Sequence, residues 1–348
     1  MIKNLFAAKI DAVIVTSNIN RFYLTKFDAS YGFLVLTENF KTFYTDLRYY
    51  HGAKEQLQDF GVKAITADNA YAAIAKDLTQ AGIKTVGYED SVISVKDFKD
   101  FKAGFKNFTL KGIGNKIDLL RLVKTEAEIN AILDAQHIAE KAFDRILDFI
   151  KPSISEKELA AQVAIECLKL GADDMAFSTI VAFGANSAIP HHKPSDKKLE
   201  KNDIILLDYG VKLNGYNSDM TRSFCIGEPA PQIISLFDTV LSAQNYALTH
   251  LKAGISCHEA DSLAREYIRA NGLEKEFSHS LGHGIGLVIH ESPRIKQDVE
   301  DVLLPGMVVS VEPGIYIAGV GGVRLEDMVV IKEDGIENLT STPKRLIY

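Results

Sequence analysis

The chain has 348 residues, of which 47% are hydrophobic and 24% charged, and its net charge at pH 7 is −7. This length allows two domains, and the composition is that of an ordinary globular protein. The acidic balance argues against nucleic acid as a partner, because phosphate binding requires an excess of lysine and arginine. The three cysteines are scattered, the first residues do not form a signal peptide, and no apolar run reaches the ~18 residues of a membrane span. We therefore expect a cytoplasmic protein without a membrane partner.

The first part of the chain predicts a small α/β domain. Short β-rich segments alternate with helical ones, a pattern typical of a sheet covered by helices. The expected strands are 11–16, 31–37, 41–46, 62–66 and 85–89, and the expected helices are 50–60 and 72–82. The segment LKGIGNKID, residues 110–118, is expected to be a linker. We place the domains at 1–118 and 119–348.

The second part contains an internal repeat with an offset near 100 residues. A helix is expected after Thr125, which forms an S/T-x-x-E capping box with Glu128. Two similar segments then begin at Lys151 and Lys252. Each contains a capping box, a Phe-Ser pair, a glycine and a histidine, in the order Ser155/Glu158, Phe177-Ser178, Gly184, His191 and Ser256/Glu259, Phe277-Ser278, Gly284, His290. A duplicated unit packed on itself gives pseudo-two-fold symmetry, and a site can form between its halves.

Each half predicts a hairpin that carries two carboxylates. In the first, Asn214-Gly215 is a strong turn signal. A hairpin centred there places Asp208 diagonal to Asp219 on one sheet face. In the second, a turn centred at Gly319 places Glu312 opposite Glu326.

Carboxylates that point together from apolar strands repel each other and need a compensating cation. Any one of these acids alone could be a surface residue, but two related hairpins with two acids each favour a metal site. Four carboxylates carry too much charge for one divalent ion and suit two. Two metals about 3.5–4 Å apart can activate a water and polarise a carbonyl, which is the chemistry of a hydrolase.

Three histidines lie within SHSLGHGIGLVIHESP, residues 278–293. His279 and His283 have helical ligand spacing, but the glycines around His283 disfavour a helix. His283 is a candidate ligand, and His279 is expected to pack or to support the site. His290 and its counterpart His191 are either satisfied, half-buried histidines or hydrogen-bond donors to a substrate carbonyl.

These motifs resemble the metallopeptidases of the pita-bread fold, a group that includes methionine aminopeptidase, aminopeptidase P and prolidase. The resemblance rests on SLGHGIGL, HESPRI, VEPGIYI and GGVRLED, and it covers nearly the whole chain. The first domain is similar to the creatinase/prolidase N-terminal domain, although Leu47 in TDLRYY stands where Gly or Ser is expected. The implied fold class is α+β, with a small α/β creatinase-type domain followed by a pseudo-symmetric pita-bread catalytic domain.

The resemblance implies roles for the candidate residues. Asp208 would bind one metal and His283 the other, while Asp219 and Glu326 would bridge both. Glu312 would bind the second metal and act as general base toward the bridging water. His191 and His290 would stabilise the tetrahedral intermediate or orient the substrate. Thr221 and Arg324 would orient the carboxylates. The expected cofactors are two divalent ions, Mn²⁺ first, with Co²⁺, Zn²⁺ or Fe²⁺ as alternatives.

The implied activity is hydrolysis of the bond before proline by a metal-bridging hydroxide. HESPRI is closer to prolidase, an Xaa-Pro dipeptidase, and there Arg294 would bind the carboxylate of a C-terminal proline; a surface or structural arginine is the alternative. Aminopeptidase P, acting on longer peptides, is the first rival function, and a catalytically silent binding protein is the second. The resemblance also implies a homodimer, in which TDLRYY would help to limit substrate length.

Overall fold

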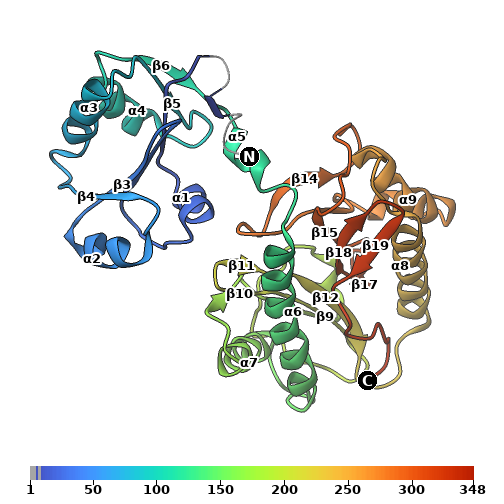
Figure 1. Ribbon diagram of the computed structural model, residues 1–348. Coiled ribbons are helices and arrows are strands. Elements are labelled where there is room, and N and C mark those ends of the chain that lie inside the picture. The colour runs from blue at the N-terminus through green and yellow to red at the C-terminus, as the bar shows by residue number, and fades with distance from the viewer. Residues whose placement is uncertain (1–4, 7–8) are drawn as a thin grey trace. The chain divides into compact units, whose positions relative to one another are not determined.

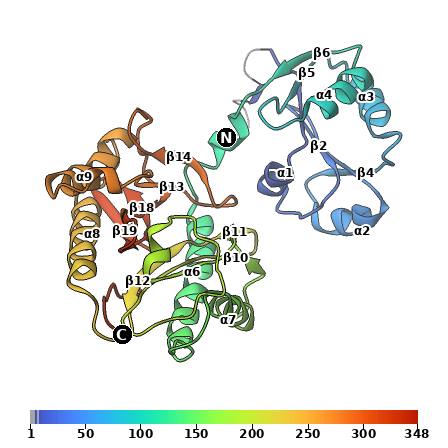
Figure 2. The same cartoon turned by 180° about the vertical axis from the view of Figure 1, so that it is seen from behind.

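A computed structural model describes residues 5–6 and 9–348 of the chain. Contacts within the chain divide it into two units, Met1–Arg121 and Leu122–Tyr348. Figures 1 and 2 show both units from opposite sides. Among the described residues, no helix combines the length and apolarity that a bilayer span requires.

The first unit is a six-stranded mixed sheet in the order β4-β3-β2-β1-β5-β6. The strands are β1 (Ala12–Val15), β2 (Phe33–Thr37), β3 (Lys41–Thr45), β4 (Gly61–Ala64), β5 (Thr85–Tyr88) and β6 (Thr109–Gly112). The helices are α1 (Asn18–Thr25), α2 (Leu47–Gln56), α3 (Ala70–Gln80), α4 (Val95–Gly104) and α5 (Lys116–Leu120).

Both faces of this sheet are buried. Val13 and Val15 of β1 join one hydrophobic core, and Ala12 and Ile14 join the other, because successive strand side chains point to opposite faces. The first core includes residues of α2, and the second includes residues of α3 and α4. The expected α/β pattern of this unit is confirmed.

The segment 110–118 differs from the expected linker. Thr109–Gly112 forms β6, which pairs parallel with β5 at the edge of the sheet, and α5 follows it. A short edge strand with little buried surface lacks the apolar alternation that identifies a strand in a sequence. Helices α1 and α4 were also not predicted.

The second unit combines four long helices with several small sheets. The helices are α6 (Glu126–Leu147), α7 (Glu156–Lys169), α8 (Pro231–His250) and α9 (Cys257–Ala270), with short 3₁₀ helices η2 (Gly184–Ala188) and η3 (Glu274–Glu276). The strands are β7 (Asp174–Met175), β8 (Ile180–Phe183), β9 (Ile204–Tyr209), β10 (Val211–Leu213), β11 (Tyr216–Asn217), β12 (Met220–Cys225), β13 (Gly282–Gly284), β14 (Glu291–Ile295), β15 (Val308–Val311), β16 (Gly314–Ile317), β17 (Gly321–Arg324), β18 (Asp327–Lys332) and β19 (Gly335–Asn338).

The two halves of this unit are built alike. Helices α6 and α7 share a core with the sheet β12-β9-β8, and α8 and α9 share another with the sheet β14-β13-β15-β18-β19. In both views of the unit, β12 and β18 lie between the pair α6 and α7 and the pair α8 and α9 (Figures 1 and 2). The predicted capping boxes at Thr125, Ser155 and Ser256 all form. The α+β class and the pseudo-symmetric second domain are confirmed.

Candidate metal centre

The first carboxylate pair lies on β9 and β12, and its register follows from the turn. Asn214 and Gly215 have φ of 50° and 83°, the left-handed conformation that a tight hairpin turn requires. Thr221 pairs with Asp208, so Asp219, two residues before Thr221, lies diagonal to Asp208. This is the predicted arrangement.

The second pair lies where the next hairpin joins its neighbouring strands. Gly314 pairs with Arg324, and Val311 pairs with Asp327. Both pairings place Glu312 opposite Glu326, as the turn around Gly319 predicts.

His283 lies on β13 between Gly282 and Gly284, and the backbone of neighbouring segments approaches both glycines closely. A Cβ atom at Gly282 would lie 2.0 Å from the carbonyl oxygen of Ser310, and one at Gly284 would lie 2.2 Å from that of Ser292. Only glycine permits this close approach. The segment is a strand and not a helix, as its glycines indicate.

The hydrogen bonds of His283 leave one ring nitrogen facing the acids. Its Nδ1 lies 3.2 Å from the carbonyl oxygen of Gly284, so we assign the proton to Nδ1. Its Nε2 lies 3.3 Å from Glu312 Oε1 and 3.7 Å from Asp219 Oδ2. Burial, with the charge of His290 second, lowers the pKa of His283 to about 3, so the ring is neutral at physiological pH. Acceptor atoms that face one another in this way fit a bound cation.

The pKa shifts and the unsatisfied oxygens of the carboxylates also indicate a cation site. Burial, followed by the charges of neighbouring acids, raises the pKa of Asp219 and of Glu326 well above the ordinary values. Burial also raises the pKa of Glu312 to about 8, although Arg324 opposes this shift. Asp208 Oδ1 and Glu326 Oε1 are buried and accept no hydrogen bond within the described residues. Ligand atoms of Asp219, His283 and Glu326 lie within 4.8 Å of one another. This donor set of carboxylate oxygens and one imidazole suits a divalent metal.

Arg324 and Thr221 support the carboxylates. Arg324 Nη2 donates to Asp208 Oδ2 at 2.5 Å, and its Nε donates to Thr221 Oγ1 at 3.2 Å. Thr221 Oγ1 donates in turn to Glu326 Oε2 at 2.7 Å.

Tyr316 and His279 extend this chain of hydrogen bonds, and no role was expected for Tyr316. Arg324 Nη1 donates to Tyr316 Oη at 2.7 Å, and Tyr316 Oη lies 2.9 Å from His279 Nε2. Burial, with the Arg324 charge second, lowers the pKa of His279 to about 4, so the neutral ring accepts a hydrogen bond from the Tyr316 hydroxyl. His279 therefore contacts the support of the site, as expected, and its ring does not reach the acids directly. The contact between Tyr316 and Arg324 can be inferred only once the register of β16 and β17 is known.

The candidate residues open onto one cavity of about 440 Å³. Its walls include Asp208, Asp219, His283, Glu312, Glu326, Arg324, His279, His191, His290 and Arg294. His191, His290 and Arg294 are exposed and have no hydrogen-bond partner within the described part of the chain, so all are available to a substrate. Of the predicted site residues, Thr221 alone lies behind the cavity wall.

Glu156 of α7 anchors the loop that carries His191, and no pattern in the sequence pointed to this residue. Its Oε2 accepts from Ser195 Oγ at 2.6 Å and lies 2.8 Å from His192 Nε2. Its Oε1 accepts from the Phe183 N–H and from Asn186 Nδ2, both at 2.9 Å. The loop is thereby fastened on both sides of His191.

Fold and site together define a metallopeptidase. Residues 130–333 match the metallopeptidase family M24, and residues 1–123 match the creatinase/prolidase N-terminal domain. The chain belongs to metallopeptidase family M24, it has the pita-bread fold of that family, and the family implies divalent metal ions.

Several relatives match over almost the full length. The Xaa-Pro dipeptidase of Pyrococcus furiosus is 39% identical, with 100% of this chain and 98% of that protein covered. The structure of an Xaa-Pro dipeptidase from Bacillus anthracis superposes with a TM-score of 0.96 at 36% identity, covering 99% and 98% of the two chains. An X-Pro aminopeptidase from Thermotoga maritima superposes with a TM-score of 0.93 at 37% identity, covering 97% and 98%.

Proposed function

We propose that this enzyme hydrolyses the peptide bond before proline and that Xaa-Pro dipeptides are its substrates. The observation that carries the proposal is the convergence of two carboxylate hairpins and His283 on one cavity, in a chain whose full-length relatives include Xaa-Pro dipeptidases. Peptidases that bind their substrates through strand-like backbone hydrogen bonds cleave poorly before proline, because proline lacks the backbone N–H that these bonds require.

We propose Asp208, Asp219, His283, Glu312 and Glu326 as ligands of two divalent ions, with Mn²⁺ the first candidate and Co²⁺, Zn²⁺ or Fe²⁺ the alternatives. By the family resemblance, Asp208, Asp219 and Glu326 would hold one ion, and Asp219, His283, Glu312 and Glu326 would hold the other. The buried oxygens of Asp208 and Glu326 that accept no hydrogen bond within the described residues support this set. When bound, the metals would supply Lewis-acid catalysis and a water of lowered pKa.

Glu312 is also proposed to carry out the proton transfers, and the remaining side chains hold the substrate and the ligands. Glu312 accepts the proton of the attacking water and returns it to the departing proline nitrogen. His191 and His290 donate hydrogen bonds to the scissile carbonyl oxygen, which gains charge in the transition state. Arg324 and Thr221 hold Asp208 and Glu326 in place.

Arg294 is proposed to select dipeptides. Its exposed guanidinium lines the cavity and lies opposite His283 in the pairing of β13 with β14. There it can bind a proline carboxylate in a bidentate manner. Because a longer peptide has no carboxylate at this point, the arginine would favour the dipeptide.

The second candidate function is that of an aminopeptidase on longer peptides, and the similarity to the Thermotoga maritima enzyme favours it. Initial rates of the Mn²⁺-loaded protein on Ala-Pro and on Ala-Pro-Ala-Ala decide between the two. We expect faster cleavage of the dipeptide. Cleavage of the tetrapeptide alone would establish the aminopeptidase, and cleavage of neither would revive a binding role.

The remaining assignments are also proposals. The division of the contacts at Arg121 and Leu122 supports domains at 1–118 and 119–348. A cytoplasmic location is supported by three free, buried cysteines, which are typical of a reducing compartment. A homodimer is proposed from the family resemblance, and light scattering of the purified protein tests it.

A further inference from the structure

A buried polar network lies directly behind the carboxylate ligands. It consists of Arg222, Gln244, Asp327 and Lys344, and we call it the back network. Arg222 follows Thr221 on β12, so its side chain points away from the face that Thr221 presents to Glu326. Arg222 is 2% exposed, and Gln244 and Asp327 are completely buried. Ionic and amide groups this deep need full hydrogen bonding to be tolerated.

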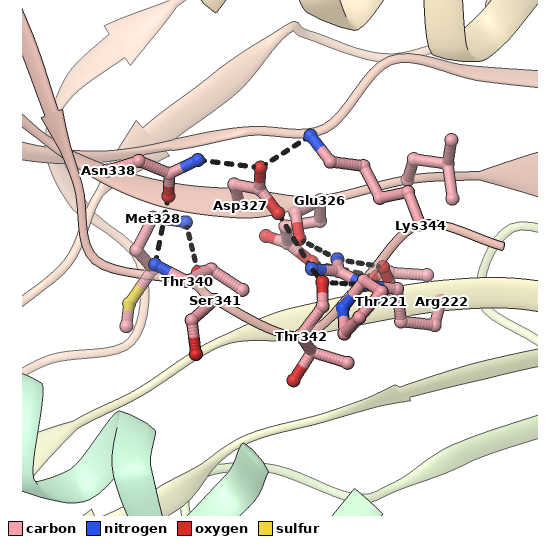
Figure 3. A network of polar contacts seen from close by, with 12 residues as sticks. Thr221, Arg222, Glu326, Asp327, Met328, Asn338, Thr340, Ser341, Thr342 and Lys344 are labelled. Carbon is pink, nitrogen blue, oxygen red and sulfur yellow. Dashed lines mark hydrogen bonds and ion pairs between the residues drawn. The ribbon is translucent and has the colours of Figure 1, made fainter.

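Arg222 uses all five of its N–H groups (Figure 3). Its Nη1 donates to the carbonyl oxygens of Thr221 at 2.9 Å and of Glu326 at 2.6 Å. Its Nη2 donates to Asp327 Oδ1 and, with Nε, to the carbonyl oxygen of Thr342. One guanidinium thus joins β12 of the first half, the start of β18 in the second half and the C-terminal segment.

Gln244 on helix α8 also binds backbone carbonyl groups next to the ligand residues. Its Nε2 donates to the carbonyl oxygens of Val311 at 2.9 Å and of Leu325 at 3.0 Å. These residues directly precede Glu312 and Glu326. Gln244 therefore fixes the backbone at the base of both carboxylates of the second hairpin.

Lys344 and Asp327 connect the two anchors. Lys344 Nζ donates to Gln244 Oε1 at 2.9 Å and to Asp327 Oδ2 at 2.6 Å. The first bond defines which end of the amide faces the strands. Asn338 Nδ2 donates a further hydrogen bond to Asp327 Oδ2 at 2.9 Å. Fully connected buried networks of this kind hold a single geometry.

We propose that Arg222 and Gln244 are positioning residues that hold the backbone beside the ligand carboxylates and thereby set the affinity for metal. The inference rests on the ligand set proposed above. Neither residue touches the cavity, so each acts through the carbonyl groups it binds. Partners behind metal ligands typically contribute about 10–100-fold to metal affinity.

The test is retention of Mn²⁺ by the full-length, Mn²⁺-loaded protein against rising chelator concentration, with bound Mn²⁺ measured by atomic emission. Arg222→Lys keeps the charge beside Asp327 but offers three donors where arginine uses five. Gln244→Met keeps the volume and removes both polar atoms. We expect each to weaken Mn²⁺ binding about 10–100-fold. If Arg222→Lys does not fold, Gln244→Met carries the test.

Gln136→Met is the matched control. Gln136 is also a completely buried glutamine on a long helix, but its Nε2 bonds the Thr340 hydroxyl at 3.4 Å and no carbonyl beside a ligand. We expect wild-type retention of Mn²⁺ in this variant. Melting temperatures are measured alongside. Equal loss of Mn²⁺ in Gln136→Met and Gln244→Met would show a general effect of stability and overturn the positioning role.

Glu326→Ala separates this inference from the proposed function. If the wild type retains no Mn²⁺, or if Glu326→Ala retains as much as the wild type, the ligand set itself is wrong. If both behave as expected while Arg222→Lys and Gln244→Met retain Mn²⁺ like the wild type, the positioning proposal alone is overturned.

Discussion

Arg324 on β17 donates a 2.5 Å hydrogen bond to Asp208 on β9, so a cation from one half of the catalytic unit holds a carboxylate of the other. The same guanidinium binds Thr221 and Tyr316, and it is almost completely buried. The bond fixes one oxygen of Asp208 and leaves Oδ1 for a metal.

Replacing Arg324 with lysine is expected to lower kcat/KM for Ala-Pro about 10–100-fold, because a lysine cannot bind Asp208, Thr221 and Tyr316 at once. Steady-state rates at saturating Mn²⁺ measure the effect. Arg269→Lys, at an exposed ion pair with Glu266 and Glu274, is the control and should match the wild type. Equal rates for the two variants would remove Arg324 from the support of the site.

His290→Ala is expected to lower kcat about 10²–10³-fold, the loss typical of a missing donor to a developing oxyanion. Its ring packs edge-on against His283 with centroids 4.4 Å apart, so metal content must be measured in the same sample. A fall in rate at full Mn²⁺ content supports the substrate role. A fall that follows loss of Mn²⁺ would assign His290 to the metal site.

Arg294→Ala is expected to raise KM for Ala-Pro about 10–100-fold with a smaller change in kcat, because a hydrogen-bonded charge contributes roughly 1.5–3 kcal/mol. Lys296→Ala removes an equal charge from an exposed residue that does not line the cavity, and it should leave KM unchanged. If both variants raise KM equally, the loss of any positive charge explains the effect, and Arg294 is a surface residue that does not bind the substrate.

Glu156 predicts a pH dependence of stability. Burial would raise its pKa, but the hydrogen bonds from Ser195, His192 and the Phe183 N–H hold it below the ordinary 4.5. A lowered pKa in the folded state gives stability that is present above pH 4.5 and is lost as the pH falls through the folded pKa.

Thermal unfolding of the wild type and Glu156→Gln at several pH values checks this sign. The difference in stability should be largest near neutral pH and should narrow below pH ~4.5. Glu200→Gln, at an exposed site, is expected to show little difference at any pH. A difference in stability between the wild type and Glu156→Gln that widens in acid would contradict the lowered pKa of Glu156.

The sequence predicted the carboxylate geometry because two turns determine it. Once Asn214-Gly215 and Gly319 are placed at the hairpin ends, the alternation of strand side chains brings the acids to one face. The capping boxes likewise located the starts of three helices.

The contacts of the back network could not be predicted in the same way. Arg222 meets Glu326 and Thr342, and Gln244 meets Val311 and Leu325, across long stretches of sequence. These pairings depend on how the two halves pack, which no local pattern encodes. Edge strand β6 was missed because it buries too little apolar surface to leave a pattern.

Metal removal tests the central claim most directly. The protein is treated with chelator, and hydrolysis of Ala-Pro is followed before treatment, after it and after Mn²⁺ is restored, with Glu312→Gln measured in parallel. We predict that hydrolysis stops on removal and returns with Mn²⁺ in the wild type, while Glu312→Gln stays inactive throughout. Unchanged hydrolysis of Ala-Pro by the metal-free protein would contradict the account.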